Sequence, residues 1–378
     1  MVSGNAETTA ADEDEHLQRL SEADRAFIDE TENPSTPDPG LRTMQQMASM
    51  TPDDRMLYQY ERAQWHASMP FLYTATATPV MNSLTVSALT ATNKPIHQRG
   101  VPVVSGPPGV GKSFIVRQFT ANELRRLARL DHIRGVQPSP SRDFDVIERS
   151  ALYIVLEDGV DVRGMYFTIL RELGWPAERR EPSVQVQRAL SACRTRLLVL
   201  DEIHNVKFDG QTGRHVHLAL KWLTNIGTRV VLCGNDIGWM LTDPPKRPIE
   251  SSRRGSKGRW IPIPVRPMGH QSTLEREAWS DLLVEYEDRL RLPGQPRRAG
   301  WLSAELADYL WVSTLGYMNS LATLIDSAAA AVAWDGTEHI TRAVLDEILL
   351  EEHVQSGRPA RLALLDRKQY DFTADTDA

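Results

Sequence analysis

The sequence predicts an α/β fold, a parallel sheet flanked by helices and followed by a small α-helical domain. Amphipathic stretches at about 112–130, 161–173, 183–194 and 212–226 predict the helices of a βαβ series. After Gly269 the strand pattern stops, and helical stretches follow at about 272–291, 303–313, 317–333 and 341–352. The strands themselves are five short apolar runs of the kind found in buried parallel strands, at Val101–Ser105, Ala151–Leu156, Arg196–Leu200, Arg229–Cys233 and Trp260–Val265.

Composition sets the class of protein. The chain has 378 residues, of which 41% are hydrophobic and 25% charged, so it is too apolar for a disordered chain and long enough for more than one domain. Two cysteines, Cys193 and Cys233, are too few for a disulfide scaffold or a four-cysteine zinc site. No apolar run reaches membrane-spanning length, and the first residues are acidic where a signal peptide is basic. We therefore expect a cytoplasmic protein with no membrane partner.

The ends of the chain read differently from its centre. Residues 1–40 carry eleven acidic residues and two arginines, a local charge of −9, whereas the rest of the chain carries +2. This composition predicts an acidic disordered tail over 1–45. An N-terminal helical segment over 46–100 follows, with one helix starting after Thr51 and a second from Pro79 to Thr92. An α/β domain is then expected at 101–268, a helical lid domain at 269–355 and a C-terminal tail at 356–378.

The most specific motif follows the first apolar run and precedes a helical stretch. Its glycines let backbone N–H groups close around a phosphate, and the start of the helix adds a positive end. Lys112 is expected to reach the β- and γ-phosphates, and the Ser113 hydroxyl to bind Mg²⁺. This P-loop, with the residue after it, gives the candidate nucleotide-binding residues Gly106, Pro107, Pro108, Gly109, Val110, Gly111, Lys112, Ser113 and Phe114.

Two carboxylates end the third apolar run. In an open parallel sheet, strand ends lie at the ligand-binding edge, so Asp201 and Glu202 are expected close to the P-loop. Asp201 is the candidate to hold Mg²⁺ and to contribute to cofactor binding. Glu202 is the candidate catalytic residue that orients the attacking water. His204 fits packing, or the orientation of a neighbouring side chain, better than proton transfer.

The fourth run ends in a polar residue. Asn235 would sit beside the end of the Asp201-Glu202 strand and could hydrogen-bond the γ-phosphate or the attacking water. Asn235 is therefore a second candidate catalytic residue, beside Glu202. A helix cap for residues 236–242 explains the same asparagine equally well, and both roles can hold at once.

Arginine-rich segments offer two further functions. Between 246 and 266 the chain has seven basic residues and one acid, which suits either a nucleic-acid surface or an arginine delivered to a neighbouring subunit's γ-phosphate. Arg259 is our choice for that arginine, with Arg253 and Arg254 as rivals, and a solvated loop remains an alternative. A second cluster could line a DNA channel or form an exposed helix face; it comprises Arg125, Arg126, Arg129, Arg134 and Arg142.

Together these motifs resemble the AAA+ ATPases over roughly residues 60–355. Asp201-Glu202-Ile203-His204-Asn205, and a later strand ending Cys233-Gly234-Asn235, look similar to the TniB and TnsC group of transposition ATPases, which are of the MuB type. The resemblance implies a Mg²⁺-dependent ATPase that forms a homo-oligomeric ring or filament on duplex DNA. It also implies communication with a DDE transposase on another chain. In one departure, Asn319 stands where AAA+ lids usually carry an arginine.

The expected function is therefore ATP hydrolysis that regulates a transposase. Two alternatives stay open, and the first of them would use the same site residues. One is a helicase-loader or initiator-like DNA-dependent ATPase. The other is a nucleotide-dependent signalling or defence switch without DNA.

Overall fold

The computed structural model describes residues 16–33, 36–91, 95–136, 147–176, 178, 180–206, 210–237, 259–295 and 300–373. Contacts divide the chain into two compact units. The α/β unit comprises Met1–Asn33, Pro79–Pro107 and Lys112–Val265. The helical unit comprises Pro34–Thr78, Pro108–Gly111 and Arg266–Ala378.

A five-stranded parallel sheet forms the centre of the α/β unit, in the strand order β2-β3-β4-β1-β5. Because β1 lies between β4 and β5, the loop that follows it opens at the interior of the carboxyl edge, where ligands bind in such sheets. Each strand coincides with one of the predicted apolar runs, so the predicted fold class is confirmed. The strands are β1 (Val101–Gly106), β2 (Ala151–Val155), β3 (Leu197–Asp201), β4 (Arg229–Asn235) and β5 (Trp260–Pro264).

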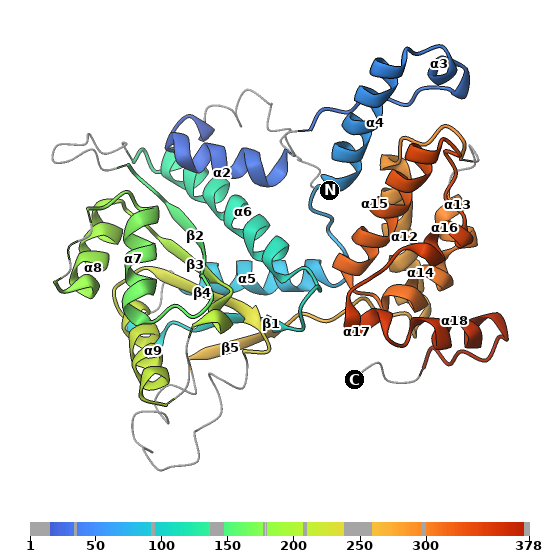
Figure 1. Cartoon of the computed structure of the whole chain (residues 1–378). Helices are drawn as coiled ribbons and strands as arrows, with labels where there is room; N and C mark the ends of the chain where they lie inside the picture. The colour runs from blue at the N-terminus through green and yellow to red at the C-terminus, as the bar shows by residue number, and fades with distance from the viewer. Residues whose placement is uncertain are drawn as a thin grey trace, which may run out of the picture. The chain divides into compact units, whose positions relative to one another are not determined.

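Helices cover both faces of this sheet (Figure 1). Leu198 and Leu200 of β3 join the core formed with α7 (Val162–Glu172), α8 (Pro182–Ala192) and α9 (Gly210–Leu223). Val199 and Asp201 alternate to the opposite face. On that face lies α6 (Lys112–Ile133), against which α2 (Glu22–Glu32) packs. Two further elements precede β1, namely α5 (Ala77–Ala91) and the 3₁₀ turn η1 (Ile96–Gln98).

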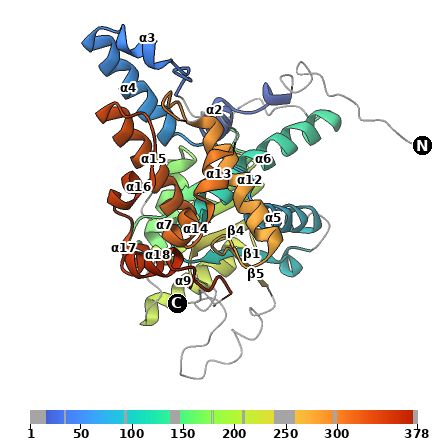
Figure 2. The ribbon, with the colours of Figure 1, turned by 90° about the vertical axis from the view of Figure 1, so that its right-hand side faces the viewer.

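Helices alone make up the described part of the helical unit. Trp279, Leu310, Leu321 and Ala328 are completely or almost completely buried in its core. In this unit α4 runs alongside α15, as Figure 2 shows. None of the helices described in either unit combines the length and apolar character needed to cross a membrane. The helices are α3 (Met44–Ala48), α4 (Pro52–Ala67), α12 (Thr273–Arg289), α13 (Trp301–Glu305), α14 (Ala307–Thr314), α15 (Met318–Asp335), α16 (Arg342–Glu347), α17 (Glu352–Gln355) and α18 (Arg358–Asp366).

The termini differ from the sequence-based expectation. Residues 22–32, within the segment predicted to be disordered, form α2, and Asp24 and Ile28 on its inner face are buried. Arg358–Asp366, within the predicted C-terminal tail, form α18, whose Arg358 is 2% exposed. The acidic composition predicted disorder wrongly for α2, because a few buried residues at helical spacing are enough to pack a short helix against its neighbours. Residues 1–15 and 374–378 lie outside the described part of the chain.

Candidate functional site at the carboxyl edge of the sheet

The P-loop connects β1 to α6, as the sequence predicts. Gly109 and Gly111 have φ values of 80° and 92°, in the left-handed region that favours glycine. The loop therefore turns tightly between the strand and the helix, and α6 begins at Lys112. This is the backbone arrangement in which N–H groups and the positive end of a helix face an anion.

Lys112 lies folded back over the loop. Its Nζ donates a hydrogen bond to the Pro107 carbonyl at 2.6 Å, and the residue is 5% exposed. Burial lowers the pKa of Lys112, and the nearby carboxylates of Glu202 and Asp201 act in the opposite direction. The predicted lysine and the two predicted acids therefore share one electrostatic environment.

Asp201, the last residue of β3, is held from three sides. Its Oδ2 accepts a hydrogen bond from the Tyr153 hydroxyl at 2.7 Å, and its Oδ1 accepts one from the Glu202 backbone N–H at 2.8 Å. The Cys233 thiol also bonds this carboxylate, and burial raises the pKa of that thiol. Asp201 is 1% exposed, so a buried carboxylate is kept in one orientation by donors rather than by a basic residue.

Glu202 and Asn235 meet through His204. The Asn235 backbone N–H donates to His204 Nδ1 at 3.1 Å, which leaves the proton on Nε2. The Nε2–H can then donate to Glu202 Oε2, 3.2 Å away. The Asn235 amide nitrogen, 3.0 Å from Nε2, is itself a donor, so Asn235 bonds the imidazole through its backbone N–H. Glu202 has a left-handed backbone, with φ 56° and ψ 35°, a strained conformation that clusters at functional sites. The polar ends of β3 and β4 thus form one hydrogen-bonded group.

Asn235 also lies directly across from the P-loop. It pairs in register with Gly106, the residue at which β1 gives way to the loop. Two other candidates, Ser113 and Phe114, are in the first turn of α6, where Ser113 is half-buried and Phe114 is 61% exposed. Within the helical unit, the Asn319 backbone N–H donates to the Gly109 carbonyl at 2.9 Å.

Sequence reasoning missed one of these contributors. Tyr153 looked like one more member of an apolar strand, and nothing local to it points to Asp201, which is 48 residues away. His204 was expected to pack or to orient a neighbour, and it contacts Glu202 and Asn235. That its neighbour would be Asn235 could not be predicted, because this bond depends on strand pairing.

Arg259 lies away from this group. It directly precedes β5, so it sits at the amino edge of the parallel sheet, opposite the P-loop. Its guanidinium donates to Thr224 Oγ1 at 3.1 Å and to Asn225 Oδ1 at 2.9 Å. The rivals Arg253 and Arg254 fall outside the described residues.

The second arginine cluster is partly used within the α/β unit. Arg125 pairs with Glu32 of α2, and Arg126 donates twice to Glu123, both times at 2.7 Å. Arg142 is outside the part of the chain that the structure describes. These ion pairs support the exposed helix face, with internal partners, more than an open channel lining.

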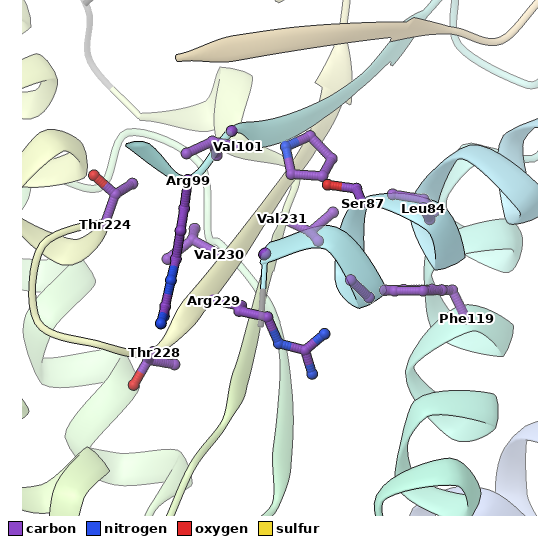
Figure 3. Close-up of a pocket in the computed structure, with 14 residues that line it drawn as sticks. Leu84, Ser87, Arg99, Val101, Phe119, Thr224, Thr228, Arg229, Val230 and Val231 are labelled. Carbon is purple, nitrogen blue, oxygen red and sulfur yellow. The ribbon is translucent and has the colours of Figure 1, made fainter. Parts of the chain in front are cut away.

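A small cavity of about 20 Å³ also lies at the amino edge (Figure 3). Leu84 and Phe119 line it beside Arg99, Val101 and Arg229, which stand at or just before the starts of β1 and β4. It contains none of the predicted nucleotide-binding or catalytic residues. The cavity and the candidate site therefore occupy opposite edges of one sheet.

Comparison with known proteins agrees with this architecture. Residues 96–238 match the family model described as AAA domain. Among solved structures, Cdc6p from Pyrobaculum aerophilum is similar, with a TM-score of 0.50 and 18% identity, over 76% of this chain and 72% of that protein. The Aeropyrum pernix ORC1 protein, in a complex with DNA, also has a TM-score of 0.50, with 14% identity, over 88% of this chain and 72% of that protein. No curated protein has a significant sequence match. Residues 96–238 are therefore similar to an AAA domain, and the sheet and P-loop have the AAA+ fold.

Proposed function

We propose that the chain binds Mg·ATP and hydrolyses it. The observation that carries this proposal is the hydrogen-bonded group of Glu202, His204 and Asn235 beside the P-loop. An acid that orients water and an amide that contacts the γ-phosphate must lie within a few ångströms of each other. Here His204 Nε2 lies 3.2 Å from the Glu202 carboxylate and 3.0 Å from the Asn235 amide nitrogen.

The side chains around the loop suit a metal-bound triphosphate. Lys112 offers an ammonium, Ser113 a hydroxyl and Asp201 a carboxylate, which are the groups that recognise phosphate and Mg²⁺. In this proposal Ser113 and Asp201 hold the metal, which neutralises charge on the phosphate oxygens. Glu202 orients the attacking water, and His204 keeps Glu202 and Asn235 in a common geometry.

Two variants test the chemistry. Lys112→Ala should lose nucleotide binding, measured by calorimetry in magnesium buffer. Glu202→Gln should retain binding while turnover falls on the order of 100-fold or more, because the water loses its oriented acceptor. Glu172→Gln, at the partly exposed end of α7, is the matched control and should hydrolyse ATP at the parental rate. Undiminished affinity in the lysine variant, or parental turnover in Glu202→Gln, would contradict these roles.

We further propose that the nucleotide governs assembly on duplex DNA. Support comes from the fold shared with the Aeropyrum protein in its DNA complex. Arg259 lies at the edge opposite its own P-loop, so it could meet a triphosphate only on a neighbouring subunit. Mixing Arg259→Ala chains with Glu202→Gln chains tests this. Partial rescue or dominance is expected, and strictly independent behaviour would argue against a shared site.

The partner protein distinguishes two forms of this proposal. The fold shared with Cdc6p supports an initiator-like or loader-like ATPase. The residues at 201–205 and 233–235 are similar to those of the TniB and TnsC group, which supports a regulator of a DDE transposase. Electron microscopy of the purified chain with duplex DNA and a slowly hydrolysed ATP analogue should show rings or filaments of the chain on the DNA. Their absence, with ATP turnover indifferent to DNA, would instead favour a signalling switch. Stimulation of a transposase encoded next to this chain would favour the transposase regulator over the initiator-like or loader-like ATPase.

A further inference from the structure

Tyr153 places a lone hydroxyl against the carboxylate at the end of β3. It lies on β2, an edge strand, and pairs in register with Val199, two residues before Asp201. Residues two apart on a strand share a face, so the long side chain of Tyr153 reaches diagonally to Asp201. Its hydroxyl donates a hydrogen bond to Asp201 Oδ2 at 2.7 Å, so the phenol is the donor of this pair.

The N-terminal helix α2 packs against this tyrosine. The rings of Phe27 and Tyr153 lie 5.8 Å apart at a tilt of 42°. Arg117 of α6, the helix that begins at Lys112, has its guanidinium carbon 5.5 Å from the centre of the Phe27 ring. Phe27 thus lies between the P-loop helix and the strand that carries the hydroxyl.

Polar contacts fix α2 at both ends. Near its start, Asp24 accepts a hydrogen bond from the Ser150 backbone N–H at 3.1 Å and from Arg149 Nε at 2.9 Å. Ser150 and Arg149 immediately precede β2. Near the end of α2, Thr31 accepts from Arg117 Nε at 3.1 Å, and Glu32 pairs with Arg125. The helix therefore spans the space between β2 and α6 and fixes the side chain between them.

We propose that Tyr153 is a positioning residue for Asp201, and that α2 holds Tyr153 in place through Phe27. The inference rests on the proposed Mg·ATP function. With the Tyr153 hydroxyl on Oδ2 and a backbone N–H on Oδ1, the carboxylate cannot rotate away from the side of the sheet where Lys112 lies. Docking of α2 is thereby coupled to the affinity of the site for Mg²⁺.

The test separates metal binding from nucleotide binding. Affinity for a fluorescent ATP analogue is measured in EDTA and across a Mg²⁺ titration. Tyr153→Phe keeps the ring and removes one hydrogen bond to a charged group. It should leave affinity in EDTA unchanged while raising the Mg²⁺ concentration for half-maximal enhancement about tenfold. Tyr166→Phe is the matched control, because Tyr166 packs on Trp222 at the opposite face and should behave like the parent.

A second variant tests the role of α2. Phe27→Ala should raise the Mg²⁺ requirement about threefold, since the hydroxyl is loosened and not removed. The double variant should need no more Mg²⁺ than Tyr153→Phe alone, because Phe27 acts through that hydroxyl. Unchanged Mg²⁺ dependence in Tyr153→Phe would overturn the positioning role, and additive effects would overturn the role of α2. A parent chain that binds no nucleotide in either condition would overturn the proposed function, and this inference with it.

Discussion

Two polar helices near the N-terminus dock in opposite electrostatic ways. In the α/β unit, α2 supplies carboxylates, of which Asp24 is buried and Glu32 partly exposed, to arginines of distant segments. In the helical unit, α4 supplies the cation: Arg62 donates two hydrogen bonds to Glu338, at 2.6 and 2.9 Å, and both side chains are 0% exposed. The comparison shows that a polar helix packs where side chains of opposite charge are available to pair with it. The burial of an ion pair then determines how much unfolding free energy is lost when the pair is broken.

The largest effect should come from breaking the pair on α4. Glu338→Gln leaves the Arg62 guanidinium buried without a counter-charge, so the unfolding free energy of the helical unit should fall by about 3–5 kcal/mol. Hydrogen exchange measured on peptides of that unit would report the loss. Asp366→Asn removes the carboxylate of an exposed pair with Arg342 and should change nothing measurable. Equal effects of the two variants would refute the importance of burial.

Breaking the apolar contact of α2 should cost less. Ile28 is 4% exposed, and Ile28→Ala should destabilise the docked helix by about 2–4 kcal/mol. The expected readout is faster amide exchange in α2 than in the parent. Ile133→Ala makes the same change at a side chain that is 68% exposed and serves as the control. Slow exchange in α2 of the Ile28 variant would mean that its ion pairs alone hold the helix.

The two helices should also respond oppositely to pH. Burial, against the opposing charge of Arg149, raises the pKa of Asp24 to about 6, and burial and neighbouring arginines lower the pKa of His66 to about 4. Below pH 4 the Asp24 contribution is fully present, and it is lost as pH rises to 6. The His66 contribution, which includes the hydrogen bond it accepts from the Arg291 backbone N–H, is complete above pH 6.5 and lost as pH falls to 4.

Variants expose these opposite slopes. As pH rises from 4 to 6, the unfolding free energy of the parent α/β unit should fall relative to that of Asp24→Asn. Over the same rise in pH, the unfolding free energy of the parent helical unit should increase relative to that of His66→Gln. Each change should be on the order of 1–3 kcal/mol. Exchange rates corrected for intrinsic pH dependence and analysed separately for the two units provide the measurement. Slopes of the same sign in both units would contradict the comparison.

The smallest expected effect concerns a single hydroxyl on α4. Tyr58 is 1% exposed and donates to the Gly40 carbonyl at 2.7 Å. Tyr58→Phe should cost about 1 kcal/mol, because the ring packing survives while the hydroxyl's bond to Gly40 and the longer one it accepts from the Arg42 backbone N–H are lost. Denaturant unfolding can resolve this loss against Tyr60→Phe, a tyrosine that is 62% exposed. No difference between the two variants would mean that the Gly40 segment contributes little.

The candidate site divides into a predictable and an unpredictable part. Lys112, Asp201 and Asn235 could be found from the sequence because each follows directly from a strand end or a glycine-rich turn, which are local patterns. Tyr153 could not, because its bond to Asp201, 48 residues away, depends on the register in which two strands pair. The docking of α2 was missed for the same reason. Its acidic composition suggested disorder, while the arginines that neutralise it lie about 90 to 125 residues away.

By itself, the sequence determined the strands, the P-loop and the two acids at the end of β3. Hydrophobic periodicity and glycine placement are properties of neighbouring residues, and they need no knowledge of the rest of the chain. Only the tertiary structure decided which hydroxyl fixes Asp201, that His204 joins Glu202 to Asn235, and to which unit α2 and α4 belong. These contacts depend on burial and on the pairing of polar groups from segments that are distant in the sequence. They contribute to stability only after those segments have packed together and excluded water.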